Sequence, residues 1–306
     1  MYIITDDKRF AEKTLGFNPE WQDNLKTGTN PVLLKSLFAA KTYSAESDNF
    51  KDWNYLFIVK HAHSSQYQLL TELAGKDIDL SDRIICLAGS GDNFKGQRDR
   101  KWVSLEGNIH LSIFFKPNQP IDYFHVGFTI LTAISVIQTI DQIPELKDKA
   151  AIKWVNDIII NNAKVSGVLA HTLTQGPKVT EVILGIGLNV ESEPHFKTDL
   201  FVHEATALKR YVTDSTQLKQ SHIISNLLNS LMRNYDYILN GRYTYLLNIY
   251  KNRSVVLGKN IIVYSDPING KPEIIDNGKV TSIGNNLELY LDNKSTPVVR
   301  GRAVLV

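Results

Sequence analysis

The sequence predicts an α+β protein, with a mixed sheet and flanking helices followed by a small β-barrel at the C-terminus. Two patterns carry this prediction. From residue 55 onward, short apolar runs bounded by Asn, Gly or Pro alternate with amphipathic helical patterns. From Gly258 the helical patterns stop, and short apolar or alternating runs typical of strands follow. The composition, with 43% hydrophobic and 22% charged residues, is that of an ordinary globular protein.

The first 54 residues contain short apolar clusters and one expected helix over 31–42, and the sequence assigns this segment no role. Residues 55–252 form the expected main domain. Its predicted strands are 55–59, 84–88, 109–115, 152–160, 164–173 and 181–190, and its predicted helices are 65–74, 126–140, 221–239 and 243–251. The helix over 126–140 is the clearest, because isoleucines recur along it at spacings of three and four.

Residues 253–306 form the expected third part. Strands are predicted over 260–264, 287–291 and 298–306. A hairpin turn is predicted at Asp276-Asn277-Gly278, because Asn-Gly between apolar runs tolerates the positive φ angles of tight turns. About 50 residues with this pattern are sufficient for a small barrel.

Length and composition exclude several classes of protein. The 306 residues carry a formal net charge of +2, which is too small to indicate nucleic-acid binding by itself. The sequence lacks an apolar run of about 20 residues, so no membrane partner is expected. The single cysteine, Cys86, lies in an apolar run, where a buried core residue is expected, and it cannot form an internal disulfide. A cytoplasmic location is the simplest expectation.

A basic loop separates two of the predicted strands. The segment from Phe94 to Trp102 places four cations, Lys95, Arg98, Arg100 and Lys101, between the runs 84–88 and 109–115. Cations held between strands can bind a phosphate or carboxylate. An ordinary solvated loop is the alternative, because runs of charge often do no more than cover a surface.

A second group of polar residues lies around a predicted hairpin. Lys153-Trp154-Val155-Asn156-Asp157 ends an apolar run, and Lys164 follows the turn at Asn161-Asn162. Pairing across this turn would bring both lysines near one site, where they could hold anionic groups. Asp157 could act through Mg²⁺, which is usually bound by one or two carboxylates together with substrate phosphates. Gly167 indicates close approach of a ligand or of another backbone segment.

Two further motifs are weaker. Leu184-Gly185-Ile186-Gly187-Leu188-Asn189 lacks the third glycine and following helix of a dinucleotide fingerprint, so tight packing competes with contact between Asn189 and a nucleotide. His61 and His63 alternate along a strand, but the sequence offers no third metal ligand at a diagnostic spacing. Ser64 or Ser65 is expected to cap the next helix, and such a helix start can also bind a polar ligand.

Taken in order, these motifs resemble those of the biotin protein ligases. The series is Ser64-Ser65-Gln66, Gly96 to Trp102 with Ser104 and Gly107, KWVND, Lys164 with Ser166 to Leu169, and GIGLN. The resemblance implies the class II synthetase-like catalytic fold of biotin and lipoate ligases, with an SH3-like C-terminal domain. It implies an AMP-forming ligase that makes biotinyl-5'-AMP and transfers biotin to a lysine of a biotin carboxyl carrier domain, with ATP and Mg²⁺ as cofactors and a homodimer as a possible assembly.

The resemblance also implies roles for individual residues. The implied catalytic residues are Lys164, Lys153 and Asp157. The implied biotin-binding residues are Ser64, Ser65, Gln66, Gly91, Lys95, Gly96, Gln97, Trp102, Gly107, Lys164 and Gly167. The implied ATP-binding residues are Arg98, Arg100, Lys101, Lys153, Asn156, Asp157 and Asn189. No metal site built from protein ligands alone is implied.

The sequence departs from the family pattern within the same motifs. Gly91 stands where a glutamine is usual, Lys95 and Gln97 stand where arginines are usual, and Val155 replaces a proline. Loss of a bidentate arginine at Gln97 predicts an adenylate held less tightly, or a loop that closes differently. Two alternatives remain: a lipoate or octanoate ligase or transferase, and a biotin-binding protein without ligase activity. DNA binding is not expected, because residues 1–55 show no helix-turn-helix pattern.

Overall fold

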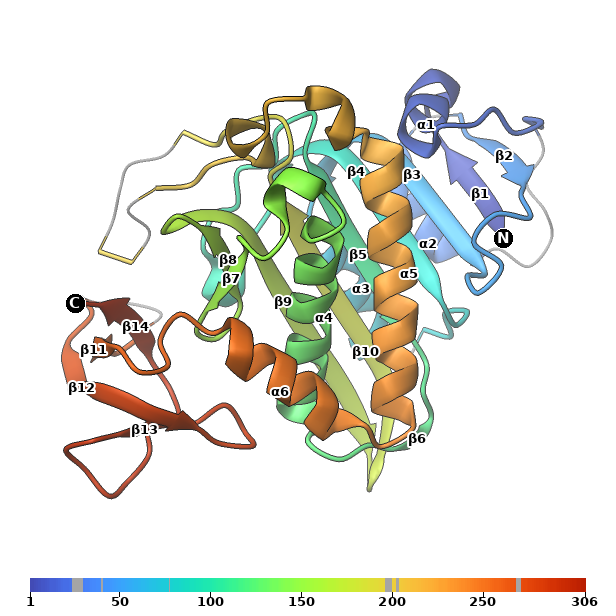
Figure 1. Ribbon diagram of the computed structural model, residues 1–306. Coiled ribbons are helices and arrows are strands. Elements are labelled where there is room, and N and C mark those ends of the chain that lie inside the picture. The colour runs from blue at the N-terminus through green and yellow to red at the C-terminus, as the bar shows by residue number, and fades with distance from the viewer. Residues whose placement is uncertain (24–29, 40, 77, 196–199, 202–203, 268–270) are drawn as a thin grey trace.

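The computed structural model describes residues 1–23, 30–39, 41–76, 78–195, 200–201, 204–267 and 271–306. Its centre is a mixed ten-stranded sheet (Figure 1). The strands run in the order β2-β1-β3-β4-β5-β10-β9-β8-β7, and the short β6 pairs with β10. Their bounds are β1 Tyr2–Thr5, β2 Tyr43–Glu46, β3 Tyr55–Ser64, β4 Ile84–Asn93, β5 Ile109–Phe115, β6 Gln119–Pro120, β7 Ala151–Lys153, β8 Asp157–Ile160, β9 Ala163–Gln175 and β10 Lys178–Leu188.

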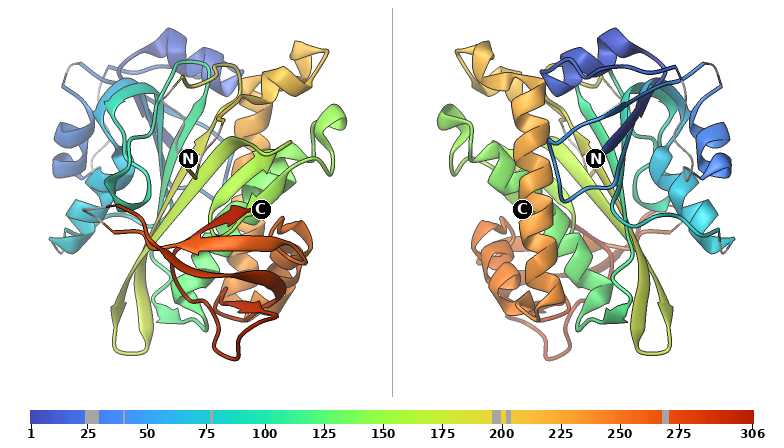
Figure 2. Two further views of the ribbon diagram at one scale, coloured as in Figure 1. Left: turned by 90° about the vertical axis from the view of Figure 1, so that its left-hand side faces the viewer. Right: turned by 90° about the vertical axis from the view of Figure 1, so that its right-hand side faces the viewer.

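Helices cover both faces of the sheet (Figures 1 and 2). On one face lie α4 (Phe124–Ile140), α5 (Gln220–Leu239) and α6 (Tyr243–Arg253), which bury the larger apolar core. On the other face α2 (Pro31–Leu37) and α3 (Gln66–Gly75) bury a second core, which contains Cys86. Burial of both faces explains why the central strands are almost continuously apolar rather than alternating. The remaining helix, α1 (Lys8–Leu15), packs against α5.

The expected α+β fold is confirmed, and the N-terminal segment is part of its sheet. β1 pairs in parallel with β3 and antiparallel with β2, so residues 1–54 extend the same sheet. The expected helix over 31–42 ends at Leu37, and residue 40 lies outside the described residues. The division at residues 54 and 252 stays a prediction. None of the described helices is long and apolar enough to cross a membrane.

The predicted hairpin around Asn161-Asn162 is confirmed. Ile160 pairs with Ala163, and both asparagines have positive φ angles, of 50° and 64°. The strand expected over 152–160 is divided, however, because Trp154 to Asn156 form a turn between β7 and β8. Asn156, in this turn, and Asp157, directly after it, line the pockets of the candidate site.

The C-terminal residues form a separate four-stranded antiparallel sheet, in the order β13-β12-β11-β14. The strands are β11 Asn260–Tyr264, β12 Ile274–Ile283, β13 Leu289–Leu291 and β14 Arg302–Leu305. The turn predicted at 276–278 is wrong: Asn277 and Gly278 lie inside β12 and pair with Ile262 and Ile261. The interstrand hydrogen bonds outweigh the local turn preference of Asn-Gly at this position.

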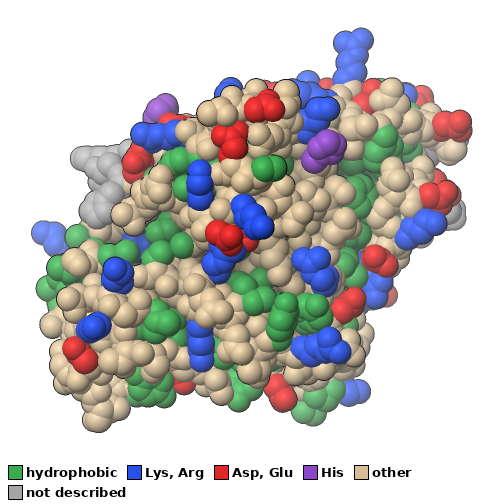
Figure 3. Space-filling view, in the orientation of Figure 1, with side chains coloured by type: hydrophobic (Ala, Val, Ile, Leu, Met, Phe, Trp, Pro, Cys, Tyr) green, Lys and Arg blue, Asp and Glu red, His purple; other side chains and the backbone are tan. Residues whose placement is uncertain are grey.

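This C-terminal sheet is fixed to the main domain by buried side chains. The indole N–H of Trp154 donates to the carbonyl of Leu287 at 2.7 Å, and the hydroxyl of Tyr243 donates to the carbonyl of Asn285. Trp154 is only 7% exposed. The contact therefore joins the turn between β7 and β8 directly to the C-terminal sheet, which lies beside that turn in Figure 2. On the molecular face in Figure 3, basic and acidic side chains are interspersed.

Candidate active site

The basic loop forms a closed hairpin between β4 and β5. The N–H of Trp102 donates to the carbonyl of Phe94 at 2.9 Å, and the N–H of Gly96 donates to the carbonyl of Arg100 at 2.7 Å. At its tip, Arg98 and Asp99 both adopt left-handed backbone conformations, with φ angles of 55° and 59°. These backbone bonds hold the cationic segment over the sheet.

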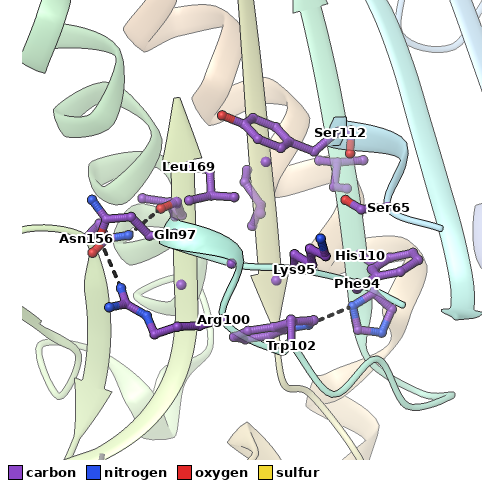
Figure 4. Close-up of a pocket in the computed structure, with 18 of the residues that line it drawn as sticks. Ser65, Phe94, Lys95, Gln97, Arg100, Trp102, His110, Ser112, Asn156 and Leu169 are labelled. Carbon is purple, nitrogen blue, oxygen red and sulfur yellow. Dashed lines mark hydrogen bonds between the residues drawn. The ribbon is translucent and has the colours of Figure 1, made fainter. Parts of the chain in front are cut away.

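Beneath this loop lies a first pocket, shown in Figure 4, of about 670 Å³ with the solvent at its mouth included. Its lining residues from the loop and neighbouring strands include Ser65, Tyr67, Phe94, Lys95, Gly96, Gln97, Trp102, His110, Ser112, Lys164, Gly167, Leu169, Gly185 and Gly187. The walls are largely apolar and aromatic, and a few polar groups point inward (Figure 4).

Paired glycines make room for Trp102. Gly167 in β9 and Gly187 in β10 are register partners, and the indole lies against them. A Cβ atom on Gly187 would be 2.3 Å from the ring of Trp102, and one on Gly167 would be 3.5 Å from it. Two residues earlier, a Cβ atom on Gly185 would be 2.9 Å from Tyr67. The two glycines of GIGLN therefore accommodate two aromatic walls of the pocket, which favours tight packing over direct contact with a nucleotide.

Trp102 is held in place by His110. The indole N–H of Trp102 donates to Nδ1 of His110 at 3.3 Å (Figure 4), and Nε2 of His110 donates to the carbonyl of Leu105 at 3.1 Å. These two bonds require the neutral tautomer with its proton on Nε2. Burial lowers the pKa of His110 to about 4, although the bond to Leu105 partly opposes this shift. The imidazole is therefore a neutral acceptor near pH 7.

A second pocket adjoins the first and continues toward the C-terminal sheet. Its empty space is about 1680 Å³, with open solvent included. Seven residues line both pockets, namely Gln97, Arg100, Lys101, Trp102, Asn156, Asp157 and Lys164. The far wall comes from the C-terminal part of the chain and consists of Asp266, Val299, Arg300, Gly301, Arg302 and Ala303. The second pocket is accordingly wider, with several cations in its walls.

Lys164 and Asp157 form an ion pair in the wall common to both pockets. Nζ of Lys164 lies 2.5 Å from Oδ1 of Asp157 and 5.6 Å from the centre of the Trp102 ring. Their side chains are only 20% and 21% exposed. A partly buried ammonium group at this junction would face an anion in either pocket. Lys153 lines the second pocket, where its ammonium group donates to the carbonyl of Phe201 at 2.5 Å.

The loop cations bind to a carboxylate of the C-terminal part. Arg98 and Arg100 both pair with Asp266, at 3.1 Å and 3.0 Å, and Arg98 also donates to the carbonyl of Asp266. Asp266 keeps only 14% of its side chain exposed. Lys95 pairs within the loop with Asp99 at 3.3 Å. The basic loop is thus attached to the C-terminal sheet region rather than freely solvated.

The two predicted asparagines are largely occupied by the protein itself. The carboxamide of Asn156 donates to the carbonyl of Val168 at 2.7 Å. Asn189, which is 1% exposed, donates to the carbonyl of Thr206 at 3.0 Å and accepts from Asn108 at 3.4 Å. Asn108 in turn accepts from three consecutive backbone N–H groups of residues 190–192. These bonds shape the floor of the second pocket.

Four predicted biotin-binding residues lie outside both pocket linings: Ser64, Gln66, Gly91 and Gly107. Gly91 packs under Phe94 and accepts a hydrogen bond from the Ser104 hydroxyl at 2.6 Å. Gly107 has a φ of 87° and supports the turn before β5. Ser65 precedes α3 but makes no side-chain capping bond, and its side chain faces the first pocket (Figure 4).

Several lining residues were not singled out by the sequence. Among them are Tyr67, His110, Ser112, Asp266, Arg300 and Arg302. Tyr67 and His110 could have been suspected as polar residues near predicted strand ends. Asp266 and the arginines give no local signal, because only the packing of the C-terminal sheet brings them to the pocket.

Comparison with known proteins agrees with this arrangement. Residues 83–189, which contain the loop, the hairpin and the glycine pair, match the model of the biotin/lipoate A/B protein ligase family. These residues, about a third of the chain, are therefore similar to the biotin/lipoate A/B protein ligase family. The matched range covers β4, the basic loop and the strands that form the floor of the first pocket.

Curated proteins match part of the chain. The chain is 29% identical over 169 residues to the bifunctional ligase/repressor BirA of Bacillus subtilis, covering 55% of this chain and 50% of that protein. It is 30% identical over 100 residues to the biotin--[acetyl-CoA-carboxylase] ligase of Paracoccus denitrificans, covering 33% of this chain and 41% of that protein. The chain thus matches about half the length, or less, of these relatives.

The fold is similar to that of a solved biotin protein ligase. A biotin protein ligase from Aquifex aeolicus, in complex with biotin and ATP, superposes with a TM-score of 0.60 at 19% identity. The match covers 82% of this chain and 98% of that chain. The likeness therefore extends beyond the matched residues 83–189 to most of the main sheet and its helices.

Proposed function

We propose that this chain is an ATP-dependent biotin protein ligase. In this proposal it joins biotin to AMP and then transfers the biotinyl group to a lysine of a biotin carboxyl carrier domain. The match of residues 83–189 to the biotin/lipoate A/B protein ligase family, the relatives named as biotin ligases, and the similar fold of a biotin ligase bound to biotin and ATP support it. A homodimer remains a further possibility that the family resemblance suggests.

The observation that carries the proposal is the position of Lys164 between two pockets of different character. The first pocket is small, walled by aromatic rings and glycines, and suits a compact uncharged ring system. The second is wide, lined by cations, and suits a nucleotide with its phosphates. A carboxylate leaving the first pocket and an α-phosphate in the second would meet at Lys164.

The first chemical step follows from this placement. A carboxylate oxygen of biotin attacks the α-phosphorus of ATP, a C–O–P link forms, the bond from the α-phosphorus to the bridging oxygen breaks, and pyrophosphate leaves. Negative charge gathers on the phosphate oxygens during this step. The ammonium group of Lys164 and the guanidinium group of Arg100 line this junction, where preorganised cations stabilise a developing charge most strongly.

The second step needs no nucleophile from the enzyme. The amine of the carrier lysine attacks the acyl carbon, an amide bond forms, AMP departs, and the amine proton passes to solvent. Holding an activated acyl group beside an amine supplies much of the rate through proximity. The open mouth of the first pocket, beside the loop from Phe94 to Trp102, gives the acceptor its path.

Asp157 fits the requirement for Mg²⁺ in the second pocket. A hard oxygen ligand suits this ion, which is usually bound by one or two carboxylates together with substrate phosphates. Asp157 lines the pocket and uses one carboxylate oxygen for Lys164, so the other is available. When bound, Mg²⁺ would neutralise charge on the phosphates.

The departures in the basic loop bear on how tightly the intermediate is retained. The carboxamide oxygen of Gln97 accepts from Arg100 at 3.3 Å, and Gln97 lines both pockets. Its carboxamide lacks the fixed charge of an arginine, and Lys95 is partly neutralised by Asp99. We infer that biotinyl-AMP escapes more readily from this protein than from a ligase with arginines at both positions.

The test is incubation with ATP, Mg²⁺, biotin and a biotin carboxyl carrier domain, followed by mass spectrometry of both proteins. Labelling of the carrier's target lysine is expected, with some scattered self-labelling from escaped adenylate. Calorimetric titration with biotin and with lipoate then separates the proposal from a lipoate ligase. Binding of biotin without biotin-dependent exchange of pyrophosphate into ATP would indicate a binding protein and contradict the proposed chemistry.

A further inference from the structure

A group of potential metal ligands lies outside the pockets, at the carboxyl ends of two neighbouring parallel strands. His61 and His63 belong to β3, and Asp92 belongs to β4. The strands pair in register, with His61 opposite Ser90 and Ser64 opposite Asn93. Because side chains alternate along a strand, His61 and His63 share one face of β3. The sequence alone indicated His61 and His63 as potential ligands. The pairing of β3 with β4 places Asp92 beside them as the third.

The geometry of these three side chains suits a small ion. Oδ2 of Asp92 lies 3.0 Å from Nε2 of His61 and 3.3 Å from Nδ1 of His63. Ligand atoms about 2.0–2.1 Å from a tetrahedral metal are about 3.3 Å apart, so these separations match two edges of such a site. Among the described residues, this is the only group of three or more His, Cys, Asp or Glu side chains whose ligand atoms lie within 4.8 Å of one another.

Neighbouring groups orient the ligands. Nδ1 of His61 lies 2.9 Å from the hydroxyl of Ser90, and a neutral ring that donates there leaves the Nε2 lone pair for a metal. The carboxamide of Asn93 donates to the carbonyl of His63 at 3.2 Å and holds the ends of the two strands together. Within the described part of the chain, Asp92 has no Lys or Arg within 4 Å, so no fixed cation competes for its carboxylate.

We propose that Nε2 of His61, Nδ1 of His63 and Oδ2 of Asp92 bind a divalent first-row transition metal of the zinc type. Two imidazoles favour such a metal over Mg²⁺ or Ca²⁺, which prefer oxygen ligands throughout. The side chains are 45%, 83% and 53% exposed, so an ion can enter from solvent and keep water in its remaining positions. This site is independent of the proposed ligase activity.

The position of the site gives the metal a structural consequence. β3 leads directly into Ser65, and β4 leads directly into Phe94 and the basic loop, so both strand ends lead into residues that line the first pocket. A metal bound by both strands would hold these ends together. Thermal stability of the chain should therefore rise when the metal is added.

The experiment is calorimetric titration of the metal-stripped, untagged full chain with Zn²⁺, together with visible spectroscopy of its Co²⁺ form. The wild-type chain is expected to bind one equivalent, with the strong visible absorption of a tetrahedral Co²⁺ site and a raised melting temperature. His63→Ala and Asp92→Asn should each weaken binding by more than about a hundredfold, and Ser90→Ala by about tenfold. His63 and Asp92 are exposed and Ser90 is half-buried, so circular dichroism should show unchanged folding.

His171→Ala is the matched control, because His171 is an exposed histidine on a strand of the same sheet outside this group. It should bind Zn²⁺ as the wild-type chain does. The proposal is overturned if the wild-type chain does not bind Zn²⁺, if His63→Ala and Asp92→Asn bind it unchanged, or if His171→Ala loses binding to the same extent.

Discussion

The two pockets are adjacent, yet they are built by different kinds of contact. In the first, Trp102 and Tyr67 pack on glycines of β9 and β10, and a neutral His110 holds the indole. In the second, the ordering contacts are ion pairs between distant parts of the chain, such as those of Arg98 and Arg100 with Asp266. Close packing does not compete with a ligand, whereas an ion pair does when the ligand is an anion. The first pocket is therefore shaped in advance, and the second must exchange partners as its ligand enters.

Lys164 belongs to both pockets, so its removal should have the largest effect. Lys164→Ala deletes the cation at the junction and leaves Asp157 without its partner. Biotin-dependent exchange of pyrophosphate into ATP should fall on the order of 10²- to 10³-fold. Lys178→Ala, an exposed lysine on β10, serves as the control and should retain full activity. Exchange within a few-fold of the wild-type rate in Lys164→Ala would place the chemistry elsewhere.

One added methyl group should disrupt the packing of Trp102 in the first pocket. Gly187→Ala places a carbon where the Trp102 ring lies, so the ring must shift. We expect a loss of about 1–3 kcal/mol in the free energy of unfolding, measured in urea, and weaker binding of biotin by calorimetry. Gly75→Ala, with no atom near the new carbon, should change neither. Adding Trp102→Leu to Gly187→Ala should recover stability if the clash is the cause.

The neutral state of His110 makes the first pocket sensitive to acid. Its pKa is lowered to about 4 in the folded chain, against 6.5 for the free group, so the unfolded chain binds the extra proton between these values. The stabilising contribution is complete above pH 6.5 and is lost as the pH falls toward 4. Between pH 7 and pH 5 it should decrease by about 2 kcal/mol.

Urea unfolding at the two pH values measures this contribution, and His110→Gln provides the comparison. The glutamine cannot titrate in this range, so its loss of stability between pH 7 and pH 5 should be smaller by about the same 2 kcal/mol. An identical pH dependence in both proteins would mean that other groups are responsible.

Asp266 should produce the smallest effect. Asp266→Asn removes the negative charge that competes with phosphates for Arg98 and Arg100, so ATP should bind about two- to fivefold more tightly. Titration with ATP measures this, and Asp276→Asn, whose partner Lys294 lies outside the pocket, is the control. Weaker binding in Asp266→Asn would show instead that the carboxylate positions the arginines for the nucleotide.

Local patterns were sufficient to predict part of this molecule. The helix over 126–140 and the strands around the basic loop have strong periodic or continuous apolar patterns, and both were predicted nearly in full. β1 was missed, because a strand of four residues gives no periodic signal and its parallel partner β3 is about fifty residues away. Asp276-Asn277-Gly278 was assigned as a turn from its local preference, which pairing with β11 overrides.

The candidate site, like the fold, could be predicted only in part from the sequence. The order of short motifs indicated Lys164, Asp157 and the basic loop, and the structure brings these together. Asp266 and Asp92 could not be found in this way, because each meets its partners only through tertiary contacts with residues about thirty or more positions away. For the same reason, the sequence could not show that the glycines of GIGLN serve two aromatic rings.

The hydrogen bond between Trp154 and Leu287 has a consequence for how the chain can be divided. Its donor belongs to the turn that carries Asn156 and Asp157, and its acceptor belongs to the C-terminal sheet. A fragment ending before residue 253 would lose this hydrogen bond, worth about 0.5–1.5 kcal/mol, and would expose the indole of Trp154 and the apolar surface around it to water. Truncation there would loosen the turn beside Lys164, so the catalytic region and the C-terminal sheet should be expressed, crystallised and engineered as one cooperative unit.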